Sequence, residues 1–285
     1  MTELPASHRP WVATLVCPDG PGIVHAISGA VVSLQGNITE SQQFSSDTGR
    51  FFMRVAFHCP DSVDVDAALA PVAEQFTADL TVVAADRPTR TLVLASKAPH
   101  CVQDLLTRQE SGWLPLEITR VMANHPTLEA LVDYHQIPFE HQPVTPETKA
   151  DFERRVLEVV EADQIELVVL ARYMQILSPE LCDVLTGRAI NIHHSFLPGF
   201  KGANPYRQAH ARGVKLIGAT AHFVTSDLDE GPIIQQNVVR VNHTDTPRDL
   251  IAVGQREESR TLTEAVKLFA EHRVLLDGVR TVIFD

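Results

Sequence analysis

Cysteine is scarce in this chain, and the few cysteines stand far apart. No two of them form a CxxC pair, which argues against a disulfide framework and against a zinc knuckle. Scattered thiols are typical of the reducing cytosol, so we expect a cytoplasmic protein. The first ten residues also lack the apolar core of a signal peptide, and export is not expected. The cysteines are Cys17, Cys59, Cys101 and Cys182.

The chain is also short of positive charge and of long apolar runs. Lys and Arg number 24 against 36 Asp and Glu, which gives a formal net charge of −12. A nucleic-acid surface needs many uncompensated cations, so no nucleic-acid partner is expected. No apolar run approaches the roughly 20 residues of a membrane span, so no membrane partner is expected. The 285 residues, 44% of them hydrophobic, predict a globular protein of about two domains.

The first part of the chain predicts a small α/β domain. Its apolar periodicities alternate in the order βαββαβ, which is the ferredoxin-like arrangement. A polar joint with a proline follows, and we place the domain boundary after Asp86, giving domains 1–86 and 87–285. The predicted elements are strand Trp11–Val16, helix Ile23–Leu34, strands Ile38–Ser45 and Arg50–His58, helix Val63–Phe76 and strand Asp79–Ala84.

The second domain predicts a doubly wound α/β fold with a mostly parallel sheet. Its apolar runs suit strands that are covered on both faces, and helical patterns fall between them. The runs are Thr91–Ser96, Leu116–Ala123, Glu166–Leu170 and Ala189–His193. Two later strands, Ile217–Thr225 and Ile233–Val241, precede a long helix over Thr246–His272.

The densest cluster of functional side chains begins in the strand Ala189–His193. Open parallel sheets bind ligands at the carboxyl ends of their strands. Residues two apart on a strand point the same way, so Asn191 and His193 project together. Asp229 follows His193 by 36 residues, in an acidic turn. Taken singly, these are strand-end caps and a solvated turn, but together they predict a general-base arrangement that activates water.

This arrangement resembles the formyltransferase-fold enzymes that use 10-formyltetrahydrofolate. Their signature, Asn-x-His-x-Ser-x-Leu-Pro and a later Asp-x-Gly, appears here as residues 191–198 and 229–231. The resemblance implies that Asn191, His193 and Asp229 are catalytic, with Asp229 as the base. The histidines show no metal-ligand spacing, so no metal is expected, and no cofactor is expected because the folate is the substrate.

A second stretch supports the resemblance. Residues 167–179, LVVLARYMQILSP, resemble the segment that wraps the folate pterin in these enzymes. The alternative is a buried corner between a strand and a helix. The folate-binding residues implied are Arg172, Tyr173, Met174, Gln175, Ile176, Leu177 and Gly231.

The first domain resembles an ACT domain in two turns. Residues 17–24, CPDGPGIV, match the first strand–helix turn of that family, and Gly36-Asn37-Ile38 matches the entry to its second strand. The resemblance implies a small amino-acid effector bound by Asp19, Gly22 and Asn37. It also implies a homo-oligomer formed through ACT domains. An ACT domain before a formyltransferase-type domain resembles the formyltetrahydrofolate deformylase family over nearly the whole chain.

The sequence differs from two other classes of formyltransferase-fold enzyme, and these differences indicate which formyl acceptor to expect. Enzymes that formylate glycinamide ribonucleotide have a Gly-Ser-rich phosphate loop, whereas residues 95–100 here read ASKAPH. Enzymes that formylate methionyl-tRNA carry an added basic C-terminal domain, which this chain does not show. Water is then the expected acceptor, and hydrolysis would supply formate for purine synthesis and balance the folate pools. Two alternatives stay open: formyl transfer to a small amine, and an amino-acid or folate sensor without turnover.

Overall fold

The computed structural model describes residues 8–197 and 205–285, so Pro198 of the motif and residues 1–7 lie outside the described residues. Its contacts divide the chain into two compact units. The first comprises residues 1–88 with 271–275 and 282–285, and the second comprises 89–270 with 276–281. Residues 271–275 and 282–285 thus belong to the first unit, although the sequence predicts them in the domain 87–285.

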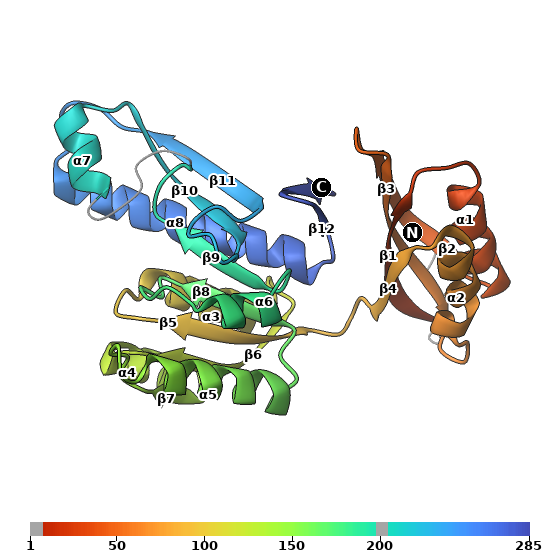
Figure 1. Ribbon diagram of the computed structural model, residues 1–285, viewed down its shortest axis with the longest axis horizontal. Helices are drawn as coiled ribbons and strands as arrows, with labels where there is room; N and C mark the ends of the chain where they lie inside the picture. The colour runs from red at the N-terminus through yellow and green to blue at the C-terminus, as the bar shows by residue number, and fades with distance from the viewer. Residues whose placement is uncertain (1–7, 198–204) are drawn as a thin grey trace. The chain divides into compact units, whose positions relative to one another are not determined.

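The first unit is a four-stranded antiparallel sheet with two helices, in strand order β2-β3-β1-β4 (Figure 1). This is the ferredoxin-like βαββαβ order that the sequence predicts. Gly22 allows the left-handed turn that begins α1, with φ of 94°, and the Asp64 carboxylate caps α2 by accepting the Ala67 N–H at 3.0 Å. The elements are β1 (His8–Pro18), α1 (Ile23–Ser33), β2 (Asn37–Ser45), β3 (Arg50–Pro60), α2 (Val65–Phe76) and β4 (Asp79–Ala84).

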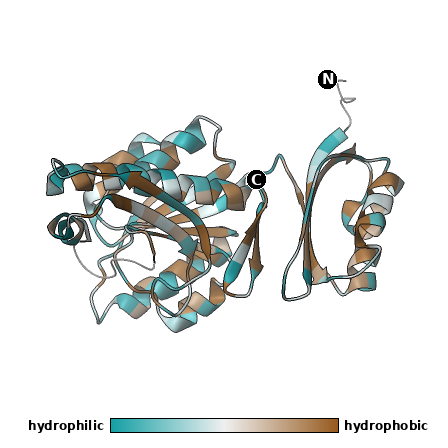
Figure 2. Ribbon diagram, turned by 90° about the horizontal axis from the view of Figure 1, so that it is seen from above, coloured by the Kyte–Doolittle hydropathy of each residue, from teal (hydrophilic) through white to brown (hydrophobic). Residues whose placement is uncertain are grey.

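Both faces of this sheet bury apolar side chains, and its strands are largely hydrophobic in Figure 2. The residues adjacent in sequence to Val16 and to Phe52 belong to the hydrophobic core between the sheet and helices α1 and α2. Because successive side chains point to opposite faces, Val16 and Phe52 themselves lie on the other face. There they contact Leu275, Val282 and Phe284 from the end of the chain. The C-terminal residues therefore complete the core of the first unit.

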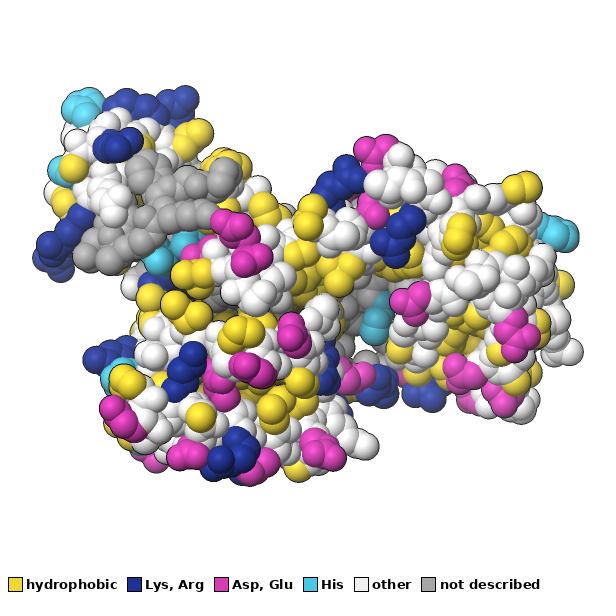
Figure 3. All heavy atoms as spheres, viewed as in Figure 1, with side chains coloured by type: hydrophobic (Ala, Val, Ile, Leu, Met, Phe, Trp, Pro, Cys, Tyr) yellow, Lys and Arg dark blue, Asp and Glu magenta, His cyan; other side chains and the backbone are white. Residues whose placement is uncertain are grey.

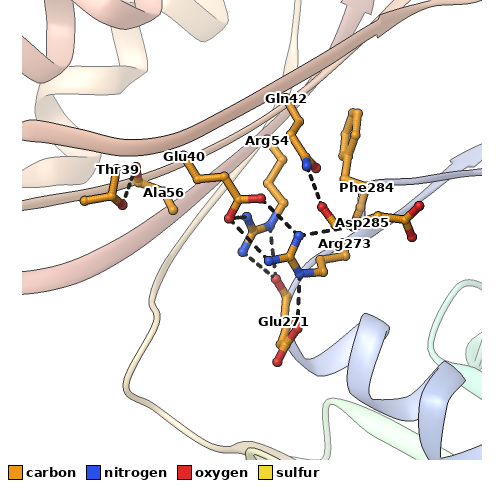
Figure 4. Close-up of polar contacts among 9 residues, drawn as sticks. All are labelled: Thr39, Glu40, Gln42, Arg54, Ala56, Glu271, Arg273, Phe284 and Asp285. Atoms are coloured by element: carbon orange, nitrogen blue, oxygen red, sulfur yellow. Dashed lines mark hydrogen bonds and ion pairs between the residues drawn. The ribbon is translucent and has the colours of Figure 1, made fainter.

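A polar cluster accompanies this packing (Figure 4). The buried Arg54 guanidinium donates to the Glu40 carboxylate at 2.9 Å and to the backbone carbonyl of Glu271 at 3.0 and 3.2 Å. Arg273 also binds Glu40, at 3.1 Å, and donates to the Phe284 carbonyl at 3.2 Å. Burial opposes ionisation of Glu40, but the two guanidinium groups outweigh it and lower the pKa of Glu40.

The second unit is a seven-stranded sheet in the order β11-β10-β9-β8-β5-β6-β7. Strands β9, β8, β5, β6 and β7 run parallel, while β10 runs antiparallel to both neighbours, which confirms the predicted doubly wound, mostly parallel fold. The short β7 was not predicted. The strands are β5 (Thr89–Ala95), β6 (Leu116–Ala123), β7 (Phe139–His141), β8 (Leu167–Ala171), β9 (Ala189–His193), β10 (Leu216–Phe223) and β11 (Ile233–Arg240).

Helices cover the sheet of the second unit (Figure 1). The longest, α8, follows β11, and a hairpin of β12 (Val274–Asp277) and β13 (Arg280–Ile283) follows α8. The sequence analysis did not predict this hairpin. The helices are α3 (His100–Glu110), η1 (Pro126–Leu128), α4 (Glu129–Tyr134), α5 (Lys149–Ala162), α6 (Pro179–Val184), α7 (Pro205–Arg212) and α8 (Pro247–Ala270).

The surface reflects the acidic composition. On the face shown in Figure 3, acidic side chains are dispersed widely, and Lys and Arg gather over the part that carries α7. Among the described residues, no helix combines the length and the apolarity that a membrane span requires. Cys17, Cys59, Cys101 and Cys182 are buried free thiols.

Candidate active site

The site forms where β8, β9 and β10 lie side by side. In the antiparallel pairing of β9 with β10, Asn191 lies opposite His222 and His193 lies opposite Thr220. The Thr220 hydroxyl donates to the Ser195 carbonyl at 3.0 Å and accepts the Leu197 N–H at 3.1 Å. These two hydrogen bonds fix the backbone that follows β9, so this part of the motif forms a turn and does not continue the strand.

The structure brings Asn191, His193 and Asp229 together. Nδ1 of His193 lies 3.2 Å from Oδ1 of Asp229. Asn191 reaches the same group through His222, whose Nε2 lies 3.2 Å from the Asn191 amide nitrogen and 3.7 Å from Oδ1 of Asp229. The same carboxylate oxygen thus lies at hydrogen-bond distance from His193 and somewhat farther from His222, with the amide beside the second ring.

His222 is the functional residue that the sequence reasoning missed. The strand that contains it was predicted, but its side chain was not assigned to the site. The available signal was its place in a strand that follows the Asn-His motif, but only the antiparallel register with β9 sets it opposite Asn191. Its ring is buried, and Nδ1 donates to the Phe223 carbonyl at 2.8 Å.

The hydrogen-bond partners determine where the protons lie. Burial opposes ionisation of Asp229, but its contacts with His193 and His222 outweigh that effect and hold its pKa well below the usual value. Asp229 is then a carboxylate and can only accept, so Nδ1 of His193 carries a proton. When His193 is neutral, its Nε2 presents a lone pair. This atom is buried and has no hydrogen-bond partner among the described residues.

The same reasoning orients the Asn191 amide. Since a carbonyl only accepts, Nδ1 of His222 carries a proton, and in the tautomer with this single ring proton Nε2 is an acceptor. The NH2 group of Asn191 must then face His222, with one hydrogen donated to it and the second available to a ligand. An amide with a fixed spare donor is suited to binding a developing oxyanion.

A cavity of about 240 Å³ adjoins these groups. Its volume is several times the roughly 30 Å³ that one water occupies, so it admits an organic ring. Residues 172–177, which the sequence analysis assigned to folate, line it together with Asn191, His193 and Asp229. Met174 and Ile176 expose 58% and 60% of their surfaces, so the wall offers apolar area to a ligand. The backbone there is held by the Met174 N–H, which donates to the Ser96 hydroxyl at 3.0 Å.

Three of the assigned folate residues have other contacts. Tyr173 is buried and stacks on Phe152 at a centroid distance of 5.6 Å, so its ring belongs largely to the core. The Arg172 side chain binds Glu258 and His194. Gly231 is not among the residues that line this cavity, and a Cβ at its position would overlap the Phe223 carbonyl. Gly231 thus allows the Asp229 turn to lie close against β10.

Backbone strain accompanies the site. Arg172 and Asp229 both have left-handed φ angles, of 61° and 58°. For residues other than glycine this conformation costs on the order of 1 kcal/mol or more, and such strain gathers at functional sites. Arg172 directly follows β8 and Asp229 lies in the loop between β10 and β11, and their side chains contact His194 and His193.

The three residues assigned to an effector do not form one site within the first unit. Asp19 follows β1, whose last residue Pro18 pairs with Arg50, whereas Asn37 pairs with His58 at the far end of β3. Eight residues of extended strand correspond to about 26 Å. Asp19 and Gly22 share the exposed β1–α1 turn, and Asn37 lies at the opposite end of the sheet.

One buried cluster has side chains of the kind that bind metals: His100, Cys101 and Glu258. Its donor chemistry does not fit an ion. The Glu258 carboxylate is already bound by the Arg172 guanidinium, at 3.2 Å, and by the Tyr206 hydroxyl. Burial and the nearby Glu258 raise the pKa of the Cys101 thiol well above its usual value, so it is not a thiolate ligand.

Comparison with known proteins agrees with this geometry. Residues 89–266 match the formyl transferase family. The formyltetrahydrofolate deformylase of Corynebacterium sp. (strain P-1) is 49% identical over 277 residues, which cover 95% of this chain and 97% of the relative.

Solved structures give the same result. A formyltetrahydrofolate deformylase from Burkholderia mallei has a TM-score of 0.93 and 49% identity, and the match covers 97% of this chain and 100% of that chain. A glycinamide ribonucleotide transformylase from Symbiobacterium toebii has a TM-score of 0.64 and 34% identity over 70% of this chain and 95% of its own. This chain therefore belongs to the formyl transferase family and, within it, to the formyltetrahydrofolate deformylases.

Proposed function

We propose that this protein hydrolyses 10-formyltetrahydrofolate to formate and tetrahydrofolate. The observation that carries the proposal is the His193–Asp229 pair beside the oriented Asn191 amide, at the wall of a cavity bounded by residues 172–177. Its relatives of 40–49% identity are named as deformylases, and the alternatives of amine formylation and ligand sensing are not favoured.

In the proposed reaction, water adds to the formyl carbon. Nε2 of His193 accepts the proton of the attacking water, and the resulting imidazolium is stabilised by Asp229 at Nδ1. The Asn191 N–H that is not donated to His222 donates to the oxyanion. The bond between carbon and N10 then breaks, N10 keeps the electron pair and takes the proton from His193, and formic acid loses its proton to become formate.

This assignment refines the role of Asp229. The sequence analysis expects Asp229 to be the general base. A carboxyl group whose pKa is held well below its usual value is a weak base. It is better suited to orient the imidazole and to stabilise its charge, while His193 carries the proton between water and N10.

Formate release in buffer without any added acceptor tests the function. We expect formate and tetrahydrofolate to appear in equal amounts from 10-formyltetrahydrofolate and water alone. Turnover that appears only with an added amine would identify a formyltransferase instead. Binding of the folate with no turnover under either condition would identify a sensor.

We further propose that the first unit is an ACT-type regulatory domain. The exposed Asp19 and the left-handed Gly22 at the start of α1 offer a carboxylate and backbone N–H groups to a small amino acid. Strands β2 and β4 are the edges of the sheet and are available for pairing between copies. We also propose that the protein acts in the cytoplasm and that the formate it releases is used in purine synthesis.

The full-length chain is the correct material for testing this regulation, because residues 271–275 and 282–285 pack within the first unit. Each common amino acid is added while formate release and binding are measured. We expect one of them to change the rate, and Asp19→Asn to abolish that response while leaving the basal rate intact. If no amino acid binds, the first unit does not sense amino acids.

A further inference from the structure

We propose that Glu258 is a positioning residue for the reaction, acting through Arg172 to hold His194 in one tautomer against the ring of His193. Glu258 lies in α8 and is separated in sequence from every residue of the catalytic motif. No sequence signal had assigned it a role. This inference deepens the proposed function and rests on it only for the kinetic part of its test.

Glu258 is a buried carboxylate with partners from three other elements. Only 1% of its surface is exposed. Its Oε2 lies 2.8 Å from Nε2 of His100, at the start of α3, and 3.2 Å from Nε of Arg172, just after β8. Its Oε1 accepts the hydroxyl of Tyr206 in α7. The carboxylate therefore contacts side chains from the start of α3, from the residue after β8 and from the start of α7.

Arg172 connects Glu258 to His194 of the catalytic motif. Nε of Arg172 lies 3.2 Å from the Glu258 carboxylate as an ion pair, without a hydrogen bond to a described residue, and Nη1 lies 2.7 Å from Nδ1 of His194. A guanidinium has only donors, so Nδ1 of His194 must be the acceptor and the ring proton must sit on Nε2. The ion pair with Glu258 and the hydrogen bond to His194 come from one planar group, so Glu258 favours the orientation of Arg172 in which the tautomer of His194 is fixed.

His194 in turn supports His193. The two rings stack, with centroids 4.9 Å apart and planes inclined by 24°. The titratable and charged groups that act on His194 are Arg172 just after β8, His193 from β9, Glu258 from α8 and Asp229 from the loop after β10. The Tyr206 ring lies at 6.4 Å. Burial first, and then the Arg172 charge, lower the pKa of His194 to about 4. His194 therefore stays neutral near pH 7, and it is His193 whose Nδ1 contacts the Asp229 carboxylate at 3.2 Å.

Glu258 also balances charge. Without its carboxylate, the Arg172 guanidinium would stand uncompensated beside two imidazoles and would oppose their protonation. A buried carboxylate is costly unless it is paired, and a well-packed apolar side chain is often at least as stable at such a position. A role in orienting Arg172 explains a buried charge that stability alone does not require.

The test compares Glu258→Gln with Glu264→Gln. Glu264 lies in the same helix, binds Gln235, Asn237 and Arg260, and belongs to neither the cavity wall nor the Glu258 cluster. For Glu258→Gln we expect kcat to fall at least tenfold with KM changed less than threefold, and the acid limb of the kcat profile to move to lower pH. For Glu264→Gln we expect kcat and the acid limb to stay as in the wild type.

Histidine ring 15N spectra give a readout that a merely structural role would not move. In the wild type we expect the His194 signals, assigned with His194→Gln, to show a bare Nδ1 and a protonated Nε2. In Glu258→Gln this tautomer should no longer be dominant. Arg172→Lys, which keeps the charge but loses the planar fork, should release the tautomer in the same way and serves if Glu258→Gln does not fold.

An unchanged tautomer in either folded variant, or an unchanged kcat profile in Glu258→Gln, would overturn the proposal. The spectra do not depend on turnover. A wild-type protein that releases no formate would therefore disprove the proposed function, while the spectra would still decide the role of Glu258 in holding His194.

Discussion

The amide nitrogen of Asn191 lies 3.2 Å from Nε2 of His222, across the antiparallel pair of β9 and β10. Because His222 donates its other ring nitrogen to the Phe223 carbonyl, this contact determines which way the Asn191 amide faces. The oxyanion donor of the proposed reaction is therefore aimed by a histidine that does not itself belong to the Asn-His motif.

His222→Ala should lower kcat by about tenfold, the equivalent of one net hydrogen bond, because the Asn191 amide loses the partner that orients it. His222→Gln should retain more activity, since its side-chain carbonyl can still accept from Asn191. Steady-state kinetics on both variants, with folding checked by circular dichroism, measures the difference. Equal activity of Ala and Gln variants at the wild-type level would show that Asn191 is oriented without His222.

Asn191→Ala should lower kcat by roughly 10²-fold to 10³-fold and change KM far less. Its donor is aimed at charge that appears only in the transition state, so the loss falls on the chemical step. Formate release at saturating and at low folate separates the two constants. A rise in KM at constant kcat would mean that Asn191 binds the substrate rather than the oxyanion.

Asp229→Asn should keep the fold and most of the folate affinity while turnover falls by roughly two or more orders of magnitude. The amide cannot stabilise a charged His193, and it can stabilise the wrong tautomer of that ring. Turnover and folate binding are measured on the same preparation. Near-normal formate release from the folded variant would remove Asp229 from the proposed mechanism.

Stability should fall as the pH is lowered from about 6.5 to about 4. The unfolded chain binds a proton at His194 near the ordinary value of 6.5, whereas the folded protein does so only near a pKa of about 4. Between these values the unfolded state holds more protons, so the free energy of unfolding decreases with decreasing pH. Denaturant titrations across this range measure the slope, and His194→Gln should flatten it. An equal slope in the variant would assign the effect to other groups.

Phe284→Ala should destabilise the first unit by about 3 kcal/mol, because Phe284 is 6% exposed and packs with Phe52 and Leu275. Val279→Ala, at the 85% exposed turn of the same hairpin, is the matched control and should have little effect. Calorimetry of the full-length variants compares their unfolding transitions. Equal destabilisation by both substitutions would mean that Phe284 does not contribute to this core.

Much of the architecture could be predicted because it is written in local patterns. Apolar periodicity predicted the order of the strands and helices apart from β7, β12 and β13, with bounds such as Leu116–Ala123 and Ala189–His193 reproduced by β6 and β9. Asn191, His193 and Asp229 stood out because of their residue types and order. In the structure, the strand end and the turn that carry these three residues line the same cavity.

The remaining features depend on contacts between distant parts of the chain, which leave no periodic signal. Strand register alone sets His222 opposite Asn191 and carries Asn37 away from Asp19. Packing of α8 brings Glu258 to Arg172, and packing of the last residues places Phe284 against Phe52. The sequence by itself determined most of the elements, the family and the candidate reacting groups, because these follow from local periodicity and motif. Only the tertiary structure decided which side chains orient those groups, because that depends on register and on burial of charge between elements far apart in the chain.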